Sequence, residues 1–235
     1  MVVKELTRGF RLGKIRFDLP FCLDWETEPN PAVNEILSQP FKYLNKGTQC
    51  YVFESRDGQF VIKLFRSTSK DKVLFDACKM AYDHLREETG LIYVHLNPTP
   101  MNLPILHCKD AIGRKIQIPL DQYRFALQKK AEPLRDALLR AHGNSAQMKK
   151  RLDDFLQLLS LRTAKGIVNA DSNLSRNFGF LDDRAIEIDF GNYRQSSGDD
   201  RQAEMKRYVQ KLQVWLEKND PAWVPYLNEQ WEKSK

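Results

Sequence analysis

The chain has 235 residues, 42% of them hydrophobic and 11% aromatic, which is enough for one compact or two-lobed domain with a sizeable core. This composition excludes disorder of the whole chain. The net charge of +6, from 37 Lys plus Arg against 31 Asp plus Glu, is modest and spread along the chain. It favours an ordinary solvated surface over a nucleic-acid-binding face. No run approaches the ~18 uncharged apolar residues of a membrane span, and the charged N-terminus lacks the apolar block of a signal peptide. Because the four cysteines are isolated, as in a reducing compartment, we expect a cytoplasmic protein without a membrane span.

The first half of the chain is predicted to be β-rich. Residues 1–40 read as an irregular extension, with two short strands at best and a small helix near Pro31 to Ser38. From Phe41 onward, short apolar segments separated by turn residues predict a three-strand meander followed by three further strands. These strands are expected at 41–44, 50–55, 59–65, 105–109, 115–119 and 123–130. A helical apolar spacing, with Gly90 as a stop, predicts one helix over 69–88.

The second half is predicted to be mostly helical. A short helix is expected after Pro133, a longer one over 146–164 and another over about 199–218, each with one apolar face. A β hairpin over 178–181 and 185–190 lies between the last two helices, and a Trp-rich tail ends the chain. The fold class predicted from this order is α+β.

Two features of the β-rich half could serve a phosphate-bearing ligand. The loop after the first strand contains Gly47, which lets backbone N–H groups approach phosphates closely, although most such loops are only hairpins. Lys63 lies inside an apolar strand, where an ammonium group is costly to bury without an anionic partner. The alternative for Lys63 is an edge strand with its side chain in solvent.

Two features of the helix-rich half could serve catalysis and metal binding. Asp171 follows the long helix on a polar loop, where a carboxylate can orient or deprotonate a hydroxyl group. An Asn a few residues later can offer its carbonyl oxygen to Mg²⁺, although such residues also form simple Asx turns. Asp189 ends an apolar strand beside Gly191, a position suited to holding a metal.

In this order, the four features resemble the protein-kinase-like superfamily. Its glycine-rich loop maps onto the segment around Gly47 and Val52, its V-A-I-K strand onto 61–63, and its catalytic loop onto Asp171 and Asn177. Its D-F-G motif matches 189–191, and its hinge falls at 127–130.

The resemblance implies a bilobal kinase-like fold: an N-terminal extension over 1–40, a β-rich N-lobe with one main helix over 41–130, and a reduced helical C-lobe over 131–235. It implies ATP and Mg²⁺ as cofactors. Lys63 would contact the phosphates, Asp189 and Asn177 would hold Mg²⁺, and Asp171 would take the proton of an acceptor hydroxyl. The remaining nucleotide-binding residues that it implies are Gly47, Val52, Gln128 and Lys130. Asp83 is the expected acidic partner of Lys63.

The departures from the family pattern leave alternatives open. Asn177 lies one residue further from Asp171 than the pattern allows, so Asn173 is the alternative ligand. Asn169 and Ala170 replace the His and Arg of the catalytic loop, and two loop glycines are missing. Because the chain after Gly191 is too short for the full peptide-docking lobe, we expect a small-molecule, sugar or lipopolysaccharide-type hydroxyl acceptor, with protein Ser/Thr also possible. The alternative function is a pseudokinase, that is, a nucleotide- or protein-binding regulatory module.

Overall fold

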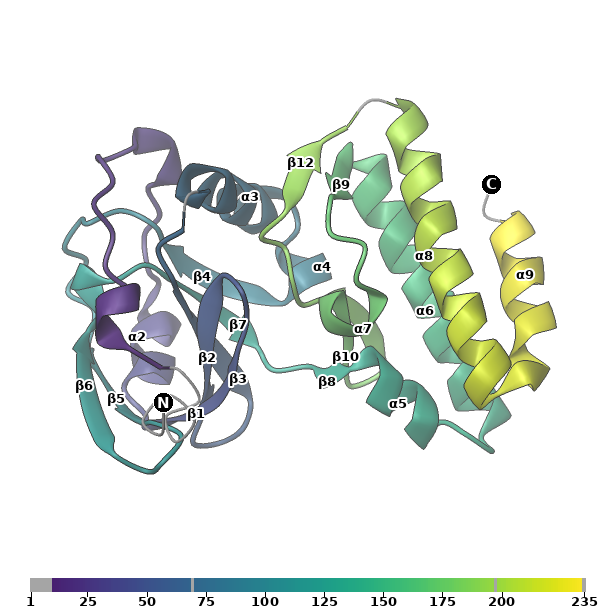
Figure 1. Ribbon diagram of the computed structural model, residues 1–235, viewed down its shortest axis with the longest axis horizontal. Helices are drawn as coiled ribbons and strands as arrows, with labels where there is room; N and C mark the ends of the chain where they lie inside the picture. The colour runs from purple at the N-terminus through teal and green to yellow at the C-terminus, as the bar shows by residue number, and fades with distance from the viewer. Residues whose placement is uncertain (1–9, 69, 197, 234–235) are drawn as a thin grey trace. The chain divides into compact units, whose positions relative to one another are not determined.

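The computed structural model describes residues 10–68, 70–196 and 198–233, which fold as α+β (Figure 1). The chain forms two compact units. The first contains the chain up to Asp83 together with Leu91–Lys130, and the second contains His84–Gly90 together with the chain from Ala131 onward. None of the described helices is long and apolar enough to cross a membrane.

The first unit is built on a seven-stranded mixed sheet, counted over the described residues, with the strand order β4-β7-β3-β2-β1-β5-β6. Only β1 and β5 pair in parallel, and every other neighbouring pair is antiparallel. The strands are β1 (Phe41–Lys46), β2 (Cys50–Ser55), β3 (Phe60–Phe65), β4 (Leu91–His95), β5 (Ile105–Lys109), β6 (Lys115–Pro119) and β7 (Phe125–Lys129). The predicted three-strand meander is confirmed as β1, β2 and β3. The turn between β2 and β3 needs a glycine, because Gly58 has a φ of +74°.

Short helices pack around this sheet. They are η1 (Leu12–Lys14), η2 (Leu23–Trp25), α2 (Pro31–Leu37), α3 (Asp71–His84) and η3 (Leu120–Gln122). Asn30 caps α2 by accepting a hydrogen bond from the Val33 N–H at 3.1 Å. The two short strands expected in the extension are not found in its described part, 10–40. The helix expected over 69–88 is wrong in its length, because Leu85 leaves the helical conformation, and the chain continues as the separate helix α4 (Arg86–Thr89) of the second unit.

The second unit is mostly helical. Its helices are α5 (Leu134–Arg140), α6 (Ser145–Ala164), α7 (Leu174–Asn177), α8 (Gly198–Asn219), η4 (Pro221–Trp223) and α9 (Val224–Lys233). Figure 1 shows α6, α8 and α9 as neighbours in this unit. Their apolar faces enclose a core that contains Leu152, Phe155, Tyr208 and Leu212. The helices predicted near Pro133, over 146–164 and over 199–218 are therefore confirmed within about two residues.

Two small sheets in the second unit position the loop that contains Asp171. The strands β10 (Phe178–Leu181) and β11 (Arg184–Glu187) form the predicted hairpin, but β11 ends at Glu187 and not at Phe190, so Asp189 lies beyond the strand. The strand β8 (Glu132–Pro133) pairs with β10 on its other side. The short strands β9 (Ile167–Asn169) and β12 (Tyr193–Gln195) pair antiparallel. The loop after β9 and the segment before β12 are thereby held next to one another.

Candidate functional site

Asp171 lies on the loop between β9 and α7, and hydrogen bonds fix the backbone on both sides of it. Its N–H donates to Asn169 Oδ1 at 2.9 Å, and its Oδ1 accepts from the Asn173 N–H at 3.0 Å. Tyr208 Oη, from α8, donates to its carbonyl oxygen. The carboxylate is only partly buried, and within the described chain its Oδ2 atom accepts no hydrogen bond. Asp171 therefore has a fixed backbone and one carboxylate oxygen available to a ligand.

Asn173 and Asn177, the two alternative metal ligands, lie in different environments. Asn173 caps α7, since its Oδ1 accepts from the Arg176 N–H at 3.2 Å. The single turn of α7 returns Asn177 to the loop, where its Nδ2 donates to the Asp171 carbonyl oxygen at 3.0 Å. Asn177 is fully buried, and its Oδ1 has no hydrogen-bond partner among the described residues. The helical turn accommodates the extra residue between Asp171 and Asn177, and it leaves the amide oxygen of Asn177, not that of Asn173, unsatisfied.

Asn169 connects the Asp171 loop to the Asp189 segment. Its Nδ2 donates to the Asp189 carbonyl oxygen at 2.9 Å and to Glu187 Oε1 at 2.7 Å, while its Oδ1 accepts from Asp171. Asp189 Oδ1 accepts from the Gly191 N–H at 3.3 Å, and its Oδ2 accepts no hydrogen bond from the described residues. Asp171, Asn177 and Asp189 are thus brought into one hydrogen-bonded arrangement through the side chain of Asn169.

A buried ion cluster lies beneath this arrangement. Arg162 of α6 is fully buried, with its Nε 2.8 Å from Glu187 Oε2 and its Nη1 3.0 Å from Glu204 Oε2. Burial raises the pKa of Glu187 to about 7, although Arg162 and the hydrogen bonds from Asn169 and Tyr193 lower it. Burial alone would lower the pKa of Arg162, but the two carboxylates raise it above its ordinary value. Glu204 Oε1 also accepts a hydrogen bond from the Asn169 N–H at 2.6 Å. The cluster therefore holds both the backbone of Asn169, through Glu204, and its side chain, through Glu187.

A hollow of about 630 Å³ opens beside Asp171. Its charged lining consists of this one carboxylate and three cations, Arg135 of α5 and Arg207 and Lys211 of α8. Lys211 Nζ donates to Ser172 Oγ at 2.7 Å, whereas Arg135 is exposed and makes no hydrogen bond or ion pair within the described chain. The hollow therefore offers positive charge next to a carboxylate that can accept a proton.

The loop around Gly47 belongs to the first unit and connects β1 to β2. The Gly47 N–H closes the hairpin by donating to the Cys50 carbonyl oxygen at 2.9 Å. The side chain of Arg66 fixes the loop, because its Nη1 donates to the carbonyl oxygens of Gly47 at 3.2 Å and Thr48 at 3.0 Å. The N–H groups of Thr48 and Gln49 find no partner among the residues described. Two backbone donors are thus available on a loop whose carbonyl groups are held.

Lys63 lies in β3, in the same row of the sheet as Val52 of β2 and Ala126 of β7. Since laterally paired residues point to the same face, the three side chains lie next to one another. Lys63 and Val52 are partly exposed, so this row is accessible on that face.

The other residues predicted in the first unit have partners of their own. Gln128 is buried, and its strand pairs with β3 on one side and β4 on the other. Lys130 forms an ion pair with Glu54, and its N–H donates to the Gln59 carbonyl oxygen at 2.8 Å. Because both residues already have partners in the sheet or in Glu54, the structure gives no support to the predicted adenine contact at Gln128 and Lys130.

Asp83, the predicted acidic partner of Lys63, lies near the end of α3. Its carboxylate forms an ion pair with Lys79 of the same helix at 2.6 Å, across one helical turn. The pairing of Asp83 with Lys63 remains a prediction.

The polar groups of the second unit fit a small, hard cation. Asp171, Asn177 and Asp189 offer only oxygen atoms, which Mg²⁺ prefers, and the buried Asn177 Oδ1 atom lacks a partner. In the described part of the chain, no group of three or more His, Cys, Asp or Glu side chains could hold a metal.

Four contributors to this site are absent from the sequence prediction: Arg162, Glu187, Glu204 and the bridging role of Asn169. Glu187 could have been found from the sequence, because it lies inside the apolar run Ala185–Ile188. A carboxylate in such a run needs a buried partner, just as the ammonium group of Lys63 does in its apolar strand. Arg162 and Glu204 lie on helices, where charged residues are usually solvated, so they gave no comparable signal. No family model and no curated protein matches this chain.

Proposed function

We propose that the chain is an ATP- and Mg²⁺-dependent phosphotransferase with a protein-kinase-like two-lobed fold, which phosphorylates a hydroxyl group of a small anionic acceptor. The observation that carries the proposal is the arrangement around Asn169. It ties Asp171 to Asp189, leaves one oxygen of each carboxylate free of protein hydrogen bonds, and lies beside the unsatisfied amide oxygen of Asn177. A buried polar atom without a partner, such as Asn177 Oδ1, is costly, so its retention favours a bound ligand.

The architecture of each unit supports the kinase-like assignment. In the first unit, β1, β2, β3, β7 and β4 are neighbours in that order and pair antiparallel, and α3 connects β3 to β4. This is a β-rich unit with one main helix, as the resemblance implies for the N-lobe. The second unit is helical with a β hairpin before the Asp189 segment.

The proposed reaction takes its residue roles from the resemblance to the protein-kinase-like superfamily. Lys63 places an ammonium group against the α- and β-phosphates of ATP, and the Thr48 and Gln49 N–H groups donate to phosphate oxygens. Asp171 Oδ2 orients the acceptor hydroxyl and takes its proton while the hydroxyl oxygen bonds to the γ-phosphorus and ADP leaves. Asp189 and Asn177 would hold Mg²⁺, which when bound neutralises charge on the phosphate oxygens.

The hollow beside Asp171 supports an anionic acceptor. Arg135, Arg207 and Lys211 line it, and Asp171 is the one acidic residue of that lining. A phosphate or carboxylate on the acceptor would bind these cations and position a neighbouring hydroxyl at Asp171. A sugar phosphate is therefore the first class of acceptor to test.

The proposal is tested by incubating the full chain with Mg²⁺ and ATP labelled at the γ-phosphate, with and without a panel of sugar phosphates. We expect label transfer that Asp189→Ala and Asp171→Ala each reduce by at least about a hundredfold. Thermal unfolding of the same variants, with and without Mg²⁺·ATP, separates binding from turnover. If wild-type protein neither gains stability from Mg²⁺·ATP nor transfers label, the proposal is wrong.

A second candidate is a pseudokinase that binds nucleotide without turnover. It is favoured by the partners that Gln128 and Lys130 already have and by the two missing loop glycines. In that case Mg²⁺·ATP would raise the melting temperature, no acceptor would be labelled, and Asp171→Ala would change neither result.

A further inference from the structure

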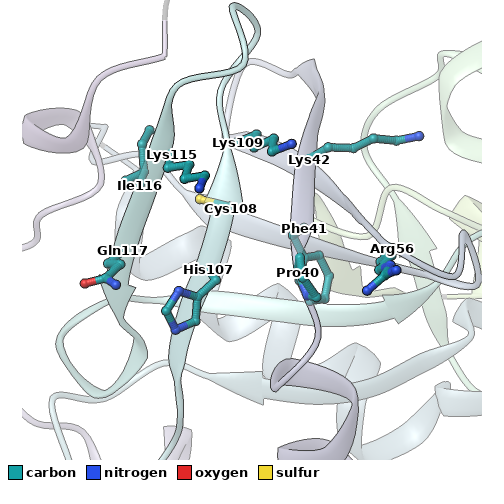
Figure 2. A pocket seen from close by; sticks show the side chains of 10 residues that line it. All are labelled: Pro40, Phe41, Lys42, Arg56, His107, Cys108, Lys109, Lys115, Ile116 and Gln117. Atoms are coloured by element: carbon teal, nitrogen blue, oxygen red, sulfur yellow. The ribbon is translucent and has the colours of Figure 1, made fainter.

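The outer face of the first sheet carries a hollow of about 630 Å³ where β1, β5 and β6 are neighbours (Figure 2). Its lining contains Lys42, Lys109 and Lys115, one from each strand, together with Arg56 and His107, and no Asp or Glu. This hollow lies wholly within the first unit. None of the residues assigned to phosphotransfer lines it.

Strand register places the three lysines in one row. Lys42 pairs with Lys109, and Lys109 pairs with Lys115. Side chains that pair laterally point to the same face, and neighbouring strands lie about 4.8 Å apart. Like charges directly opposite each other destabilise a sheet. The row is thus an unfavourable arrangement for the free protein.

The protein neutralises this row only at one end. Lys42 Nζ lies 2.8 Å from Glu54 Oε2, and Glu54 is shared with Lys130. Two cations thus compete for one carboxylate, whose pKa their hydrogen bonds lower. Lys109, Lys115 and Arg56 form no hydrogen bond or ion pair through their side chains in the described part of the chain.

We propose that this hollow binds a small molecule that carries two or more phosphate groups. The row runs roughly 10 Å across three strands, so a ligand with several phosphates can pair with its ammonium groups at once without drawing them together, whereas a single phosphate has to bring like charges onto one anion. The volume suits a small ligand, because such pockets measure about 300–1,000 Å³. Phe41, the one Phe, Tyr or Trp of the lining, is only 2% exposed, which leaves the single imidazole of His107 and not the row of aromatic rings typical of single-stranded nucleic acid sites.

The test measures tripolyphosphate binding to the full chain by isothermal titration calorimetry at constant ionic strength, with orthophosphate as the single-phosphate comparison. We expect Lys109→Gln with Lys115→Gln to weaken tripolyphosphate binding by about tenfold for each lysine. The matched control removes the same charge from α8 through Lys206→Gln with Lys218→Gln, two exposed lysines without ion pairs, and should change binding by less than about twofold.

Lys63→Met separates this hollow from the proposed nucleotide site and should leave tripolyphosphate binding at the hollow unchanged. Without ligand, the Lys109 and Lys115 variant should melt at a higher temperature than wild type, because the row of like charges is relieved. That measurement also shows that the variant folds. The proposal is overturned if wild type does not bind tripolyphosphate, if orthophosphate binds as tightly, or if Lys63→Met or the α8 control removes binding as effectively as the paired hollow variant.

Discussion

Two buried asparagines, one at the end of β9 and one at the end of α7, allow a sharp test of the candidate site. Asn169 uses its whole amide, with donors on Glu187 and Asp189 and an acceptor for Asp171. Asn177 uses only its Nδ2 atom, and its Oδ1 atom is buried without a partner among the described residues. Leucine has the same branching as asparagine, and both positions are buried. Replacing Asn169 by leucine removes three side-chain hydrogen bonds, whereas replacing Asn177 by leucine removes one.

The expected losses follow from those hydrogen bonds. Asn169→Leu removes three of them, including one to the buried Glu187 carboxylate, and leaves the partners unpaired, so the free energy of unfolding should fall by about 4 kcal/mol. Asn177→Leu removes one hydrogen bond worth about 1 kcal/mol, and the Asp171 carbonyl oxygen keeps Tyr208 as a donor. It also removes an unpaired oxygen that costs about 1–3 kcal/mol.

In metal-free buffer, Asn177→Leu should therefore be at least about 3 kcal/mol more stable than Asn169→Leu, and close to wild type apart from the steric cost that both variants share. Urea denaturation with EDTA measures this difference. Repeating it with Mg²⁺ and ATP should stabilise wild type by about 2.7 kcal/mol at a hundred times the dissociation constant, and Asn177→Leu by clearly less. Equal destabilisation of the two variants in EDTA, or equal stabilisation of wild type and Asn177→Leu by Mg²⁺·ATP, would refute the reasoning.

Three further variants test other parts of the second unit. The pKa of Glu187 is raised above its value in the unfolded chain, so the native state binds more protons than the unfolded state. The free energy of unfolding of wild type should therefore fall as pH rises from about 4.5 to 7, and urea titrations of Glu187→Gln should lack this pH dependence. A Cβ atom on Gly179 would lie 2.5 Å from the Glu132 carbonyl oxygen, so Gly179→Ala should lower the free energy of unfolding by about 2 kcal/mol or more and loosen the β8–β10 pair, which amide hydrogen exchange can follow. If the acceptor is anionic, Arg135→Gln should raise its KM about tenfold with little change in kcat, whereas an equal loss in both constants for a neutral acceptor would argue against the role given to the hollow.

The strands and helices with a strong local pattern could be predicted from the sequence. In the meander and in the pair β5 and β6, apolar and polar residues alternate or clear turn residues separate the strands. The helices α6 and α8 have continuous apolar faces. The strand β4 was missed because Leu91–His95 is an almost uninterrupted apolar run, whose period alone does not distinguish a strand from a helix end. The pairing of β9 with β12 joins segments of three residues each, and such short distant partners leave no local signal.

The sequence singles out the polar residues of the candidate site but not the side-chain contacts that connect them. The polar positions Asp171, Asn177 and Asp189 stood out because each follows an apolar or helical segment. The extra residue before Asn177 left its role open, and only the turn of α7, capped by Asn173, accounts for that spacing. Side-chain bridges between segments twenty residues apart, such as the one made by Asn169, depend on tertiary pairing and cannot be read from spacing.

The buried polar groups of the second unit divide into those that the protein satisfies and those that it does not. The charges of Arg162, Glu187 and Glu204 compensate one another, so a structural role is sufficient to explain these side chains, although Arg162 Nη2 has no hydrogen-bond partner among the described residues. No such explanation covers Asn177 Oδ1, which is buried without a partner among the described residues. A scaffold alone could replace Asn177 with an apolar residue at little cost, so the Asn177 oxygen, not the ion cluster, is the observation on which the proposed ligand rests.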